Sequence, residues 1–180
     1  MDKIREYNVS FSGLNHGKHT FEFEISQAFF DLFDFDQDFQ NPDVLINLVL
    51  DKHSTFLELN LTAEGHVNVV CDITDETYAQ PIQGEMDLMV KFGPEFDDSD
   101  DEILVIPEGE NEINVAQLIY ELILLSIPLK RVNPNLDSEQ AQNAIDLLEK
   151  YAPKVDEENP SEDKSNDPRW DSLKELFKKK

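Results

Sequence analysis

The sequence predicts an α+β fold in which an antiparallel meander sheet packs against a small number of helices. Apolar and polar residues alternate in several segments before Phe92, which is the period of half-buried strands. The stretches between these segments are short, and short connections join antiparallel neighbours, whereas parallel strands need long crossovers. Because an open meander leaves two unpaired edges, a partly closed β-barrel is the alternative arrangement of the same strands.

Two alternating segments and a short helix are expected in the first third of the chain. Tyr7–Phe11 and His19–Ile25 alternate, and the turn-forming residues Gly13–Gly17 lie between them, which predicts a hairpin with a loose loop. Ser26 is expected to cap a short helix. The apolar residues of that helix share one side: Ala28, Phe29, Leu32 and Phe33.

The strongest β pattern lies between Val44 and Phe92. Turn residues 51–54 and the pair Glu64-Gly65 divide its first half, so we expect short strands that follow one another in sequence. The expected strands are Val44–Leu50, Phe56–Ala63, Val67–Cys71, Tyr78–Ile82 and Met86–Phe92.

A nearly uninterrupted acidic run follows at residues 94–102 and predicts a mobile loop. The apolar residues Ile103–Ile106 after it predict a short strand that ends at Pro107. The carboxylates of the run are Glu95, Asp97, Asp98, Asp100, Asp101 and Glu102.

A buried helix is expected near residues 114–127, because apolar residues occupy more than one of its faces. Asn114 is its expected N-cap. Glu121 lies within the apolar surface and needs a partner there, and the candidates for this partner are Lys130 and Arg131.

The chain after this helix predicts further helices and a division into three parts. A second helix is expected to end at Pro153. We expect a single α+β domain at residues 1–152, an acidic flexible linker at 153–166 and an amphipathic C-terminal helix at 167–180. The apolar residues of the last helix share one face: Trp170, Leu173, Leu176 and Phe177.

The charge of the chain restricts its partners. Its 15 Lys and Arg residues against 39 Asp and Glu residues give a formal net charge of −24. This charge repels phosphate and anionic lipid, so it argues against a general nucleic-acid binder and against a membrane-surface protein. It favours a cationic partner, although the same charge also keeps a protein soluble whatever its function.

The cysteine count and the N-terminal residues favour a cytoplasmic protein. The single cysteine, Cys71, forms neither an internal disulfide nor a thiolate zinc site by itself, which fits a reducing compartment. The first residues contain no apolar run of the kind that begins a secretory signal.

Motifs for metal binding and catalysis are incomplete or missing. Asp34–Asp38 has the carboxylate spacing that opens an EF-hand loop, but Phe39 stands where the loop needs Gly and Leu45 where it needs Glu. The turn histidines, such as His16 and His53, have no partner cysteines and are expected to be surface residues. No nucleophile elbow, phosphate loop or zinc-protease motif occurs, so we expect no enzyme, metal or cofactor.

Two stretches combine residue types that are common at functional sites. Val67–Thr74 with Gln80–Ile82 carries Cys71, and its simplest interpretation is a hairpin with a buried cysteine. Asn166–Leu176 carries the sole tryptophan, Trp170, next to an arginine. This segment is either a helix docked on its own domain or a tethered amphipathic peptide that enters a partner's groove.

These stretches and the order of the elements resemble the YceD-like family, the large ribosomal RNA subunit accumulation proteins. The similar segments are Gly65–Asp72, Ile113–Leu122 with Leu125–Pro128, and Asp167–Trp170 with Leu173-Lys174. The resemblance spans most of the chain and implies a role in the accumulation of large-subunit rRNA, hence in ribosome assembly. It implies no catalytic residues.

The sequence departs from this family in its cysteines. Many members carry Cys-x-x-Cys at the segment of Cys71 and further cysteines near the C-terminus. This chain has Cys71 alone, and Thr74 stands where the second cysteine of the motif would be. A zinc-dependent role is therefore not carried over. A hairpin without a metal must be held by packing, so we expect Val69, Ile73 and Ile82 in the core.

We therefore expect a non-enzymatic ribosome-assembly factor that promotes large-subunit rRNA accumulation by binding a basic ribosomal protein or a pre-ribosomal particle. The alternatives are a direct RNA-binding module that uses the sheet face, which the charge argues against, and a structural interaction protein of unknown partner. The candidate contacts are Glu95, Asp97, Asp98, Asp100, Asp101, Glu102, Arg169, Trp170, Leu173 and Leu176.

Overall fold

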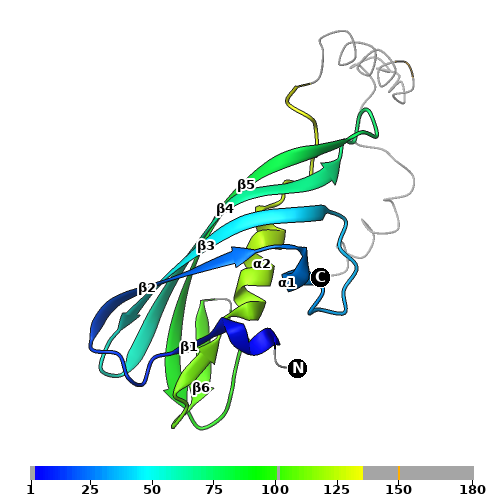
Figure 1. Ribbon diagram of the computed structural model, residues 1–180. Coiled ribbons are helices and arrows are strands. Elements are labelled where there is room, and N and C mark those ends of the chain that lie inside the picture. Colours follow the sequence, from blue (N-terminus) through cyan, green and yellow to red (C-terminus); the bar gives the residue numbers. More distant parts are fainter. Residues whose placement is uncertain (1–2, 101, 136–149, 151–180) are drawn as a thin grey trace, which may run out of the picture. The chain divides into compact units, whose positions relative to one another are not determined.

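The computed structural model describes residues 3–100, 102–135 and 150, and those up to 135 belong to one compact unit, residues 1–141. The described residues of this unit form a five-stranded sheet, a two-stranded sheet, a 3-10 helix and two α-helices (Figure 1). In chain order the elements are η1 (Lys3–Tyr7), β1 (Asn8–Ser10), β2 (Gly17–Ile25), α1 (Gln27–Phe30), β3 (Gln40–Lys52), β4 (Phe56–Val70), β5 (Thr77–Gly93), β6 (Ile103–Pro107), β7 (Glu112–Asn114) and α2 (Ala116–Ser126).

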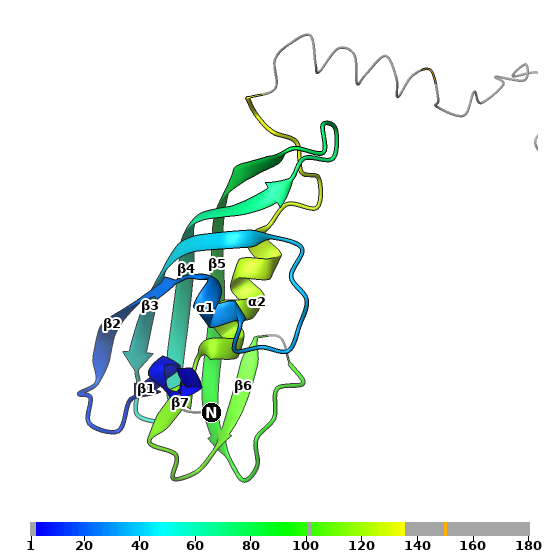
Figure 2. The same cartoon turned by 45° about the vertical axis from the view of Figure 1, so that its right-hand side comes forward.

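The large sheet has the strand order β2-β3-β4-β5-β6, and β2 to β5 run antiparallel to their neighbours. The predicted meander is confirmed for these four strands. The sheet is not closed into a barrel, because its edge strands β2 and β6 do not pair with each other. Instead, α1 and α2 cover one face of the sheet (Figures 1 and 2), so the apolar side chains of that face are buried without closure.

The last strand of the sheet, β6, departs from the predicted meander because it runs parallel to β5. Met89 is paired with Ile103, and Gly93 with Pro107. A parallel neighbour requires the chain to return along the strand before it pairs. The chain between β5 and β6 provides this return. It is long enough because β6 has only 5 residues, so the distance to be covered is short.

Two long strands replace four of the predicted short ones. β4 runs without a break through Gly65, and β5 runs through Pro81 and Gly84. Gly65 is therefore not a turn residue. A Cβ at this position would lie 2.2 Å from the backbone oxygen of Asp43, so the glycine allows β3 and β4 to approach closely.

The predicted N-terminal hairpin is wrong, because β1 pairs with β7 instead of β2. Val9 lies opposite Ile113, and both side chains are buried. Lys52 stabilises the residues between β1 and β2. Its ammonium group donates to the backbone oxygens of Phe11 at 2.8 Å and Leu14 at 3.0 Å. The alternating pattern marked the strand correctly but carried no information about its partner.

One continuous core fills the space between the sheet and the two helices. At one end, Phe30 of α1 packs edge-on against Phe29 and Phe39, with ring centroids 5.2 and 4.9 Å apart. Such edge-to-face contacts add to the free energy gained from burial. The centre of the core consists of inward-facing residues of β3 and β4: Val44, Ile46, Leu48, Leu50, Leu57, Leu59, Leu61 and Ala63.

The helix α2 is packed on the core as predicted, and its buried residues are Ala116, Ile119, Leu122 and Ile123. Asn114 lies in β7, where its side chain accepts a hydrogen bond of 3.1 Å from the first helical N–H. The partner predicted for Glu121 is wrong: Gln117 donates to its carboxylate at 2.8 Å, whereas Arg131 pairs with Asp38. No helix in the described part of the chain has the length and hydropathy of a membrane span.

Several predictions concern residues outside the described part. The predicted second helix that ends at Pro153, the linker at 153–166 and the helix at 167–180 lie there. The predicted single domain at residues 1–152 is described only as far as residue 135, apart from Lys150.

Candidate functional site

A groove of about 790 Å³ lies between α2, the strands β5 and β6, and the loop that joins those strands. Apolar side chains of the helix, of both strands and of the loop line it. Two of them are strongly exposed, since Phe96 retains 59% and Leu125 80% of its accessible surface. Exposed apolar groups gathered in a groove are typical of a surface that binds another molecule. The apolar lining includes Met86, Leu88, Phe96, Leu104, Leu118 and Leu125.

The charged residues of the groove all have the same sign. Asp98 and Asp100 come from the acidic loop, Glu110 precedes β7, and Glu121 lies on α2. Among the described residues that line the groove there is no Lys, Arg or His. The groove therefore joins an apolar floor to an acidic rim.

The acidic loop has hydrogen-bonded structure of its own, although the sequence predicted a mobile loop. The backbone N–H and C=O of Asp97 both bond Val105, at 3.0 and 2.8 Å. The Asp97 carboxylate accepts the N–H of Ser99 at 3.0 Å, and hydrogen bonds from Ser99 hold the pKa of this carboxyl below its usual value. Asp100 in turn accepts the N–H of Glu102 at 2.9 Å. These bonds fix part of the loop beside the groove, which Phe96, Asp98 and Asp100 line.

The predicted contact residues divide into four groups. Asp98 and Asp100 line the groove, whereas Glu102 lines a separate hollow on the outer face of the sheet. Glu95 and Asp97 lie in the same loop but line neither. The remaining predicted contacts lie outside the described residues: Asp101, Arg169, Trp170, Leu173 and Leu176.

Sequence reasoning missed the contribution of α2 to this groove. Gln117, Glu121 and Leu125 line it together with Asn114 and Leu118. The four that belong to α2 follow the helical spacing of three and four residues, so they share one face of the helix, and Asn114 of β7 precedes them. A half-polar face on a helix that is otherwise buried was the signal that could have revealed them.

The outer face of the sheet, which the helices do not cover, is also acidic. Strand register places the residues that face away from the core side by side on β2 to β5. Eight of these residues are carboxylates and two are lysines: Glu22, Glu24, Asp43, Asp51, Glu58, Glu64, Glu85 and Asp87, with Lys18 and Lys91.

The end of the β4–β5 hairpin holds the single cysteine. Cys71 is 1% exposed, and the N–H of Asn133 lies 3.5 Å from its Sγ. Burial opposes ionisation of the thiol, but hydrogen bonds led by that of Asn133 lower its pKa to about 7. As predicted, Val69 and Ile82 are buried in the core, and Ile73 is partly buried against it.

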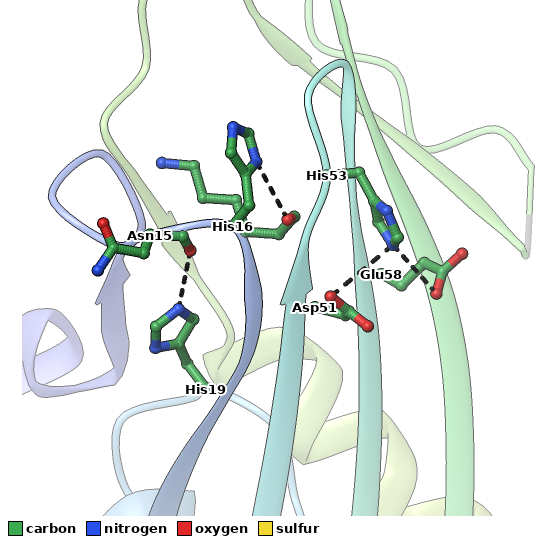
Figure 3. A network of polar contacts seen from close by, with 7 residues as sticks. Asn15, His16, His19, Asp51, His53 and Glu58 are labelled. Atoms are coloured by element: carbon green, nitrogen blue, oxygen red, sulfur yellow. Dashed lines mark hydrogen bonds and ion pairs between the residues drawn. The ribbon is translucent and has the colours of Figure 1, made fainter.

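A cluster of possible metal ligands lies at the opposite end of β4. Asp51, His53 and Glu58 each offer one ligand atom, and these atoms all lie within 4.8 Å of one another (Figure 3). His16 and His19 lie near the neighbouring turn, where their rings contact the backbone oxygens of Lys52 and Asn15 (Figure 3).

The family model described as large ribosomal RNA subunit accumulation protein YceD matches residues 59–177, which is more than half of the chain. The chain belongs to the YceD family. No match was found among curated proteins or among solved structures. Membership in the YceD family implies a role in the accumulation of large-subunit rRNA. Every residue that lines the groove beside α2 falls within the part matched to YceD, whereas Asp51, His53 and Glu58 precede it.

Proposed function

We propose that this YceD-family protein is a non-enzymatic assembly factor of the large ribosomal subunit, and that it binds a basic ribosomal protein through the groove beside α2. The observation that supports this proposal is an apolar groove whose charged lining residues are all acidic. The family supplies the ribosomal context.

A lysine- and arginine-rich segment has the chemistry that this groove recognises. The alkyl stems of Lys and Arg pack on apolar surface while their charged ends stay near water and carboxylates. An apolar anchor of the partner would contact Leu118 and Leu125, and its basic residues would reach Asp98, Asp100 and Glu121. The groove thus favours an amphipathic basic segment over a purely apolar one.

The outer face argues against the alternative of direct RNA binding through the sheet. A protein surface binds RNA by replacing the counterions of the phosphates with Lys and Arg side chains. The outer face of β2 to β5 presents eight carboxylates and two lysines, so its field opposes phosphate. The same field attracts a free basic ribosomal protein and shields its charge until that protein meets rRNA.

Affinity purification of the tagged full chain from a nuclease-treated lysate tests the proposal. We expect basic large-subunit proteins to be enriched, and the enrichment to fall as salt rises because the contacts are charge-dependent. The double variant Asp98→Asn with Asp100→Asn should reduce it several-fold. The matched control, Glu22→Gln with Glu24→Gln, removes the same charge from the outer face and should reduce it much less.

Two outcomes would contradict the proposal. Binding of purified rRNA from which ribosomal proteins have been stripped, without enrichment of any basic protein from the lysate, would favour the RNA-binding alternative. An equal loss of partner in both double variants would mean that net charge, and not the groove, determines binding.

A further inference from the structure

The hairpin between β3 and β4 places three metal-binding side chain types on the outer face of the sheet. Asp51 of β3 lies directly opposite Glu58 of β4. The N–H of His53 donates to the backbone oxygen of Phe56 at 3.1 Å and closes the turn. Asp51 and Glu58 project from the same face because they are paired in register, and the ring of His53, in the turn after β3, lies beside them (Figure 3).

The ring of His53 is held in place by packing. It stacks on the ring of Phe56, with the centroids 4.4 Å apart and the planes inclined by 17°. In this position its Nε2 points toward the two carboxylates (Figure 3). The ligand atoms are therefore brought together by strand register and by stacking.

The distances fit a bound cation better than they fit hydrogen bonds. Nε2 of His53 lies 3.5 Å from Oε2 of Glu58 and 3.9 Å from Oδ1 of Asp51. This nitrogen is shielded from solvent, yet it makes no hydrogen bond. Two ligands of a tetrahedral Zn²⁺ are about 3.3 Å apart when each bond is about 2.0–2.1 Å. A small closure of the side chains would bring the three atoms to bonding distance.

We propose that Asp51, His53 and Glu58 form a binding site for a divalent first-row transition cation, with Zn²⁺ as the representative ion. One imidazole nitrogen and two carboxylate oxygens suit such an ion, whereas Ca²⁺ and Mg²⁺ prefer sets made of oxygen alone. A cation also offsets the repulsion between Asp51 and Glu58, which lie opposite each other on adjacent strands with like charge.

The site is open to solvent on the outer face, and a lysine on the adjacent strand competes with the cation for Asp51. Asp51 and Glu58 line a hollow of about 550 Å³ that opens on the outer face, so the fourth position of the cation would face water or a small ligand. Lys18 of β2 is paired with Asp51 in register and lines the same hollow. Replacing Lys18 with Gln should therefore tighten the binding of the cation.

The site is separate from the cysteine segment of the hairpin at the other end of β4. Glu58 and Cys71 lie near opposite ends of this strand, which at about 3.3 Å per residue places them about 40 Å apart. The three ligands also precede the residues matched to the YceD family. The proposal therefore depends neither on the family nor on the groove beside α2.

Calorimetric titration of the metal-free full chain with ZnCl₂ tests the proposal. We expect one site per chain above a background of weak binding to the many other carboxylates. His53→Ala and Glu58→Gln should each weaken this site about tenfold or more. Two matched controls lie on the same strand and should leave it unchanged: His66→Ala and Glu64→Gln.

A second measurement separates ligation from a general effect on folding. In nitrogen-resolved NMR spectra of the histidine rings, Zn²⁺ should shift the Nε2 signal of His53 and leave that of His66 in place. Absence of a one-to-one site in the native chain would overturn the proposal. An equal loss of affinity in Glu58→Gln and Glu64→Gln would also overturn it, because the binding would then be distributed over the acidic surface.

Discussion

Asp72 and Arg131 exchange two hydrogen bonds that join the end of the β4–β5 hairpin to the chain after α2. The N–H of Asp72 donates to the backbone oxygen of Arg131 at 2.7 Å, and the N–H of Arg131 donates to Oδ2 of Asp72 at 2.7 Å. Beside them the N–H of Asn133 reaches the sulfur of Cys71. This hairpin carries one cysteine, and hydrogen bonds to a neighbouring segment help to hold it.

Replacing Asp72 with Ala should release this segment. The variant leaves the N–H of Arg131 without its carboxylate, so we expect the free energy of unfolding to fall by about 1–2 kcal/mol. The thiol of Cys71 should also react faster with a labelling reagent, because the residues that cover it are less firmly held. Asp72→Asn keeps an acceptor oxygen and should lose less than half as much. Urea denaturation followed by circular dichroism measures the free energy of unfolding of both variants. Equal stability of the native chain and the two variants would show that the Asp72 carboxylate does not hold this segment.

The stability conferred by Cys71 should depend on pH. Its pKa is lowered from 9.0 to about 7 in the folded protein, so the folded state binds its proton less tightly than the unfolded state. The stabilisation is therefore present above pH 9 and is lost as pH falls through about 7.

The measurement compares the native chain with Cys71→Ser, whose hydroxyl does not titrate in this range. The difference in free energy of unfolding should grow by about 1 kcal/mol between pH 6 and pH 9, after allowance for solvent screening near the hairpin end. A difference that is constant over this range would mean that the hydrogen bond from Asn133 does not favour the thiolate.

The alternation of residues was sufficient to predict the sheet but not the lengths of its strands. Glu64-Gly65 looked like a break, because glycine is common in turns as well as at close contacts between strands. In the structure Gly65 allows β3 to approach β4, and the strand continues. The pairing of β1 with β7 and the parallel β6 depend on contacts between distant segments, which no local pattern encodes.

The candidate site was predictable only in part for the same reason. Asp98 and Asp100 were visible as a run of charge, whereas Glu121 joins them only when α2 packs beside β5. His53 looked like an isolated turn residue. Its proximity to Glu58 follows from the register of one hairpin, and that register is set by which two residues form the turn.

The close packing of α2 on β5 predicts that Gly84 tolerates no side chain. A Cβ at Gly84 would lie 2.0 Å from Oγ of Ser126 and 3.1 Å from Cδ1 of Leu122. Gly84→Ala should therefore displace the helix and lower the free energy of unfolding by about 1–3 kcal/mol. Gly13→Ala is the control, because a Cβ there meets no atom within 4 Å. If thermal unfolding shows the two variants to be equally stable, the helix does not pack on β5 at Gly84.

Leu125 provides the sharpest separation between folding and partner binding. Its side chain lines the groove beside α2 but remains 80% exposed, so Leu125→Ser should change the free energy of unfolding by less than about 0.5 kcal/mol. The same change removes an apolar contact from the proposed interface, and capture of basic large-subunit proteins should fall several-fold. Leu124→Ser is the matched control, since Leu124 is its exposed neighbour on α2 and does not line the groove. Affinity purification of the two variants in parallel tests whether the partner contacts the groove beside α2. Equal capture by both variants would show that the partner binds elsewhere.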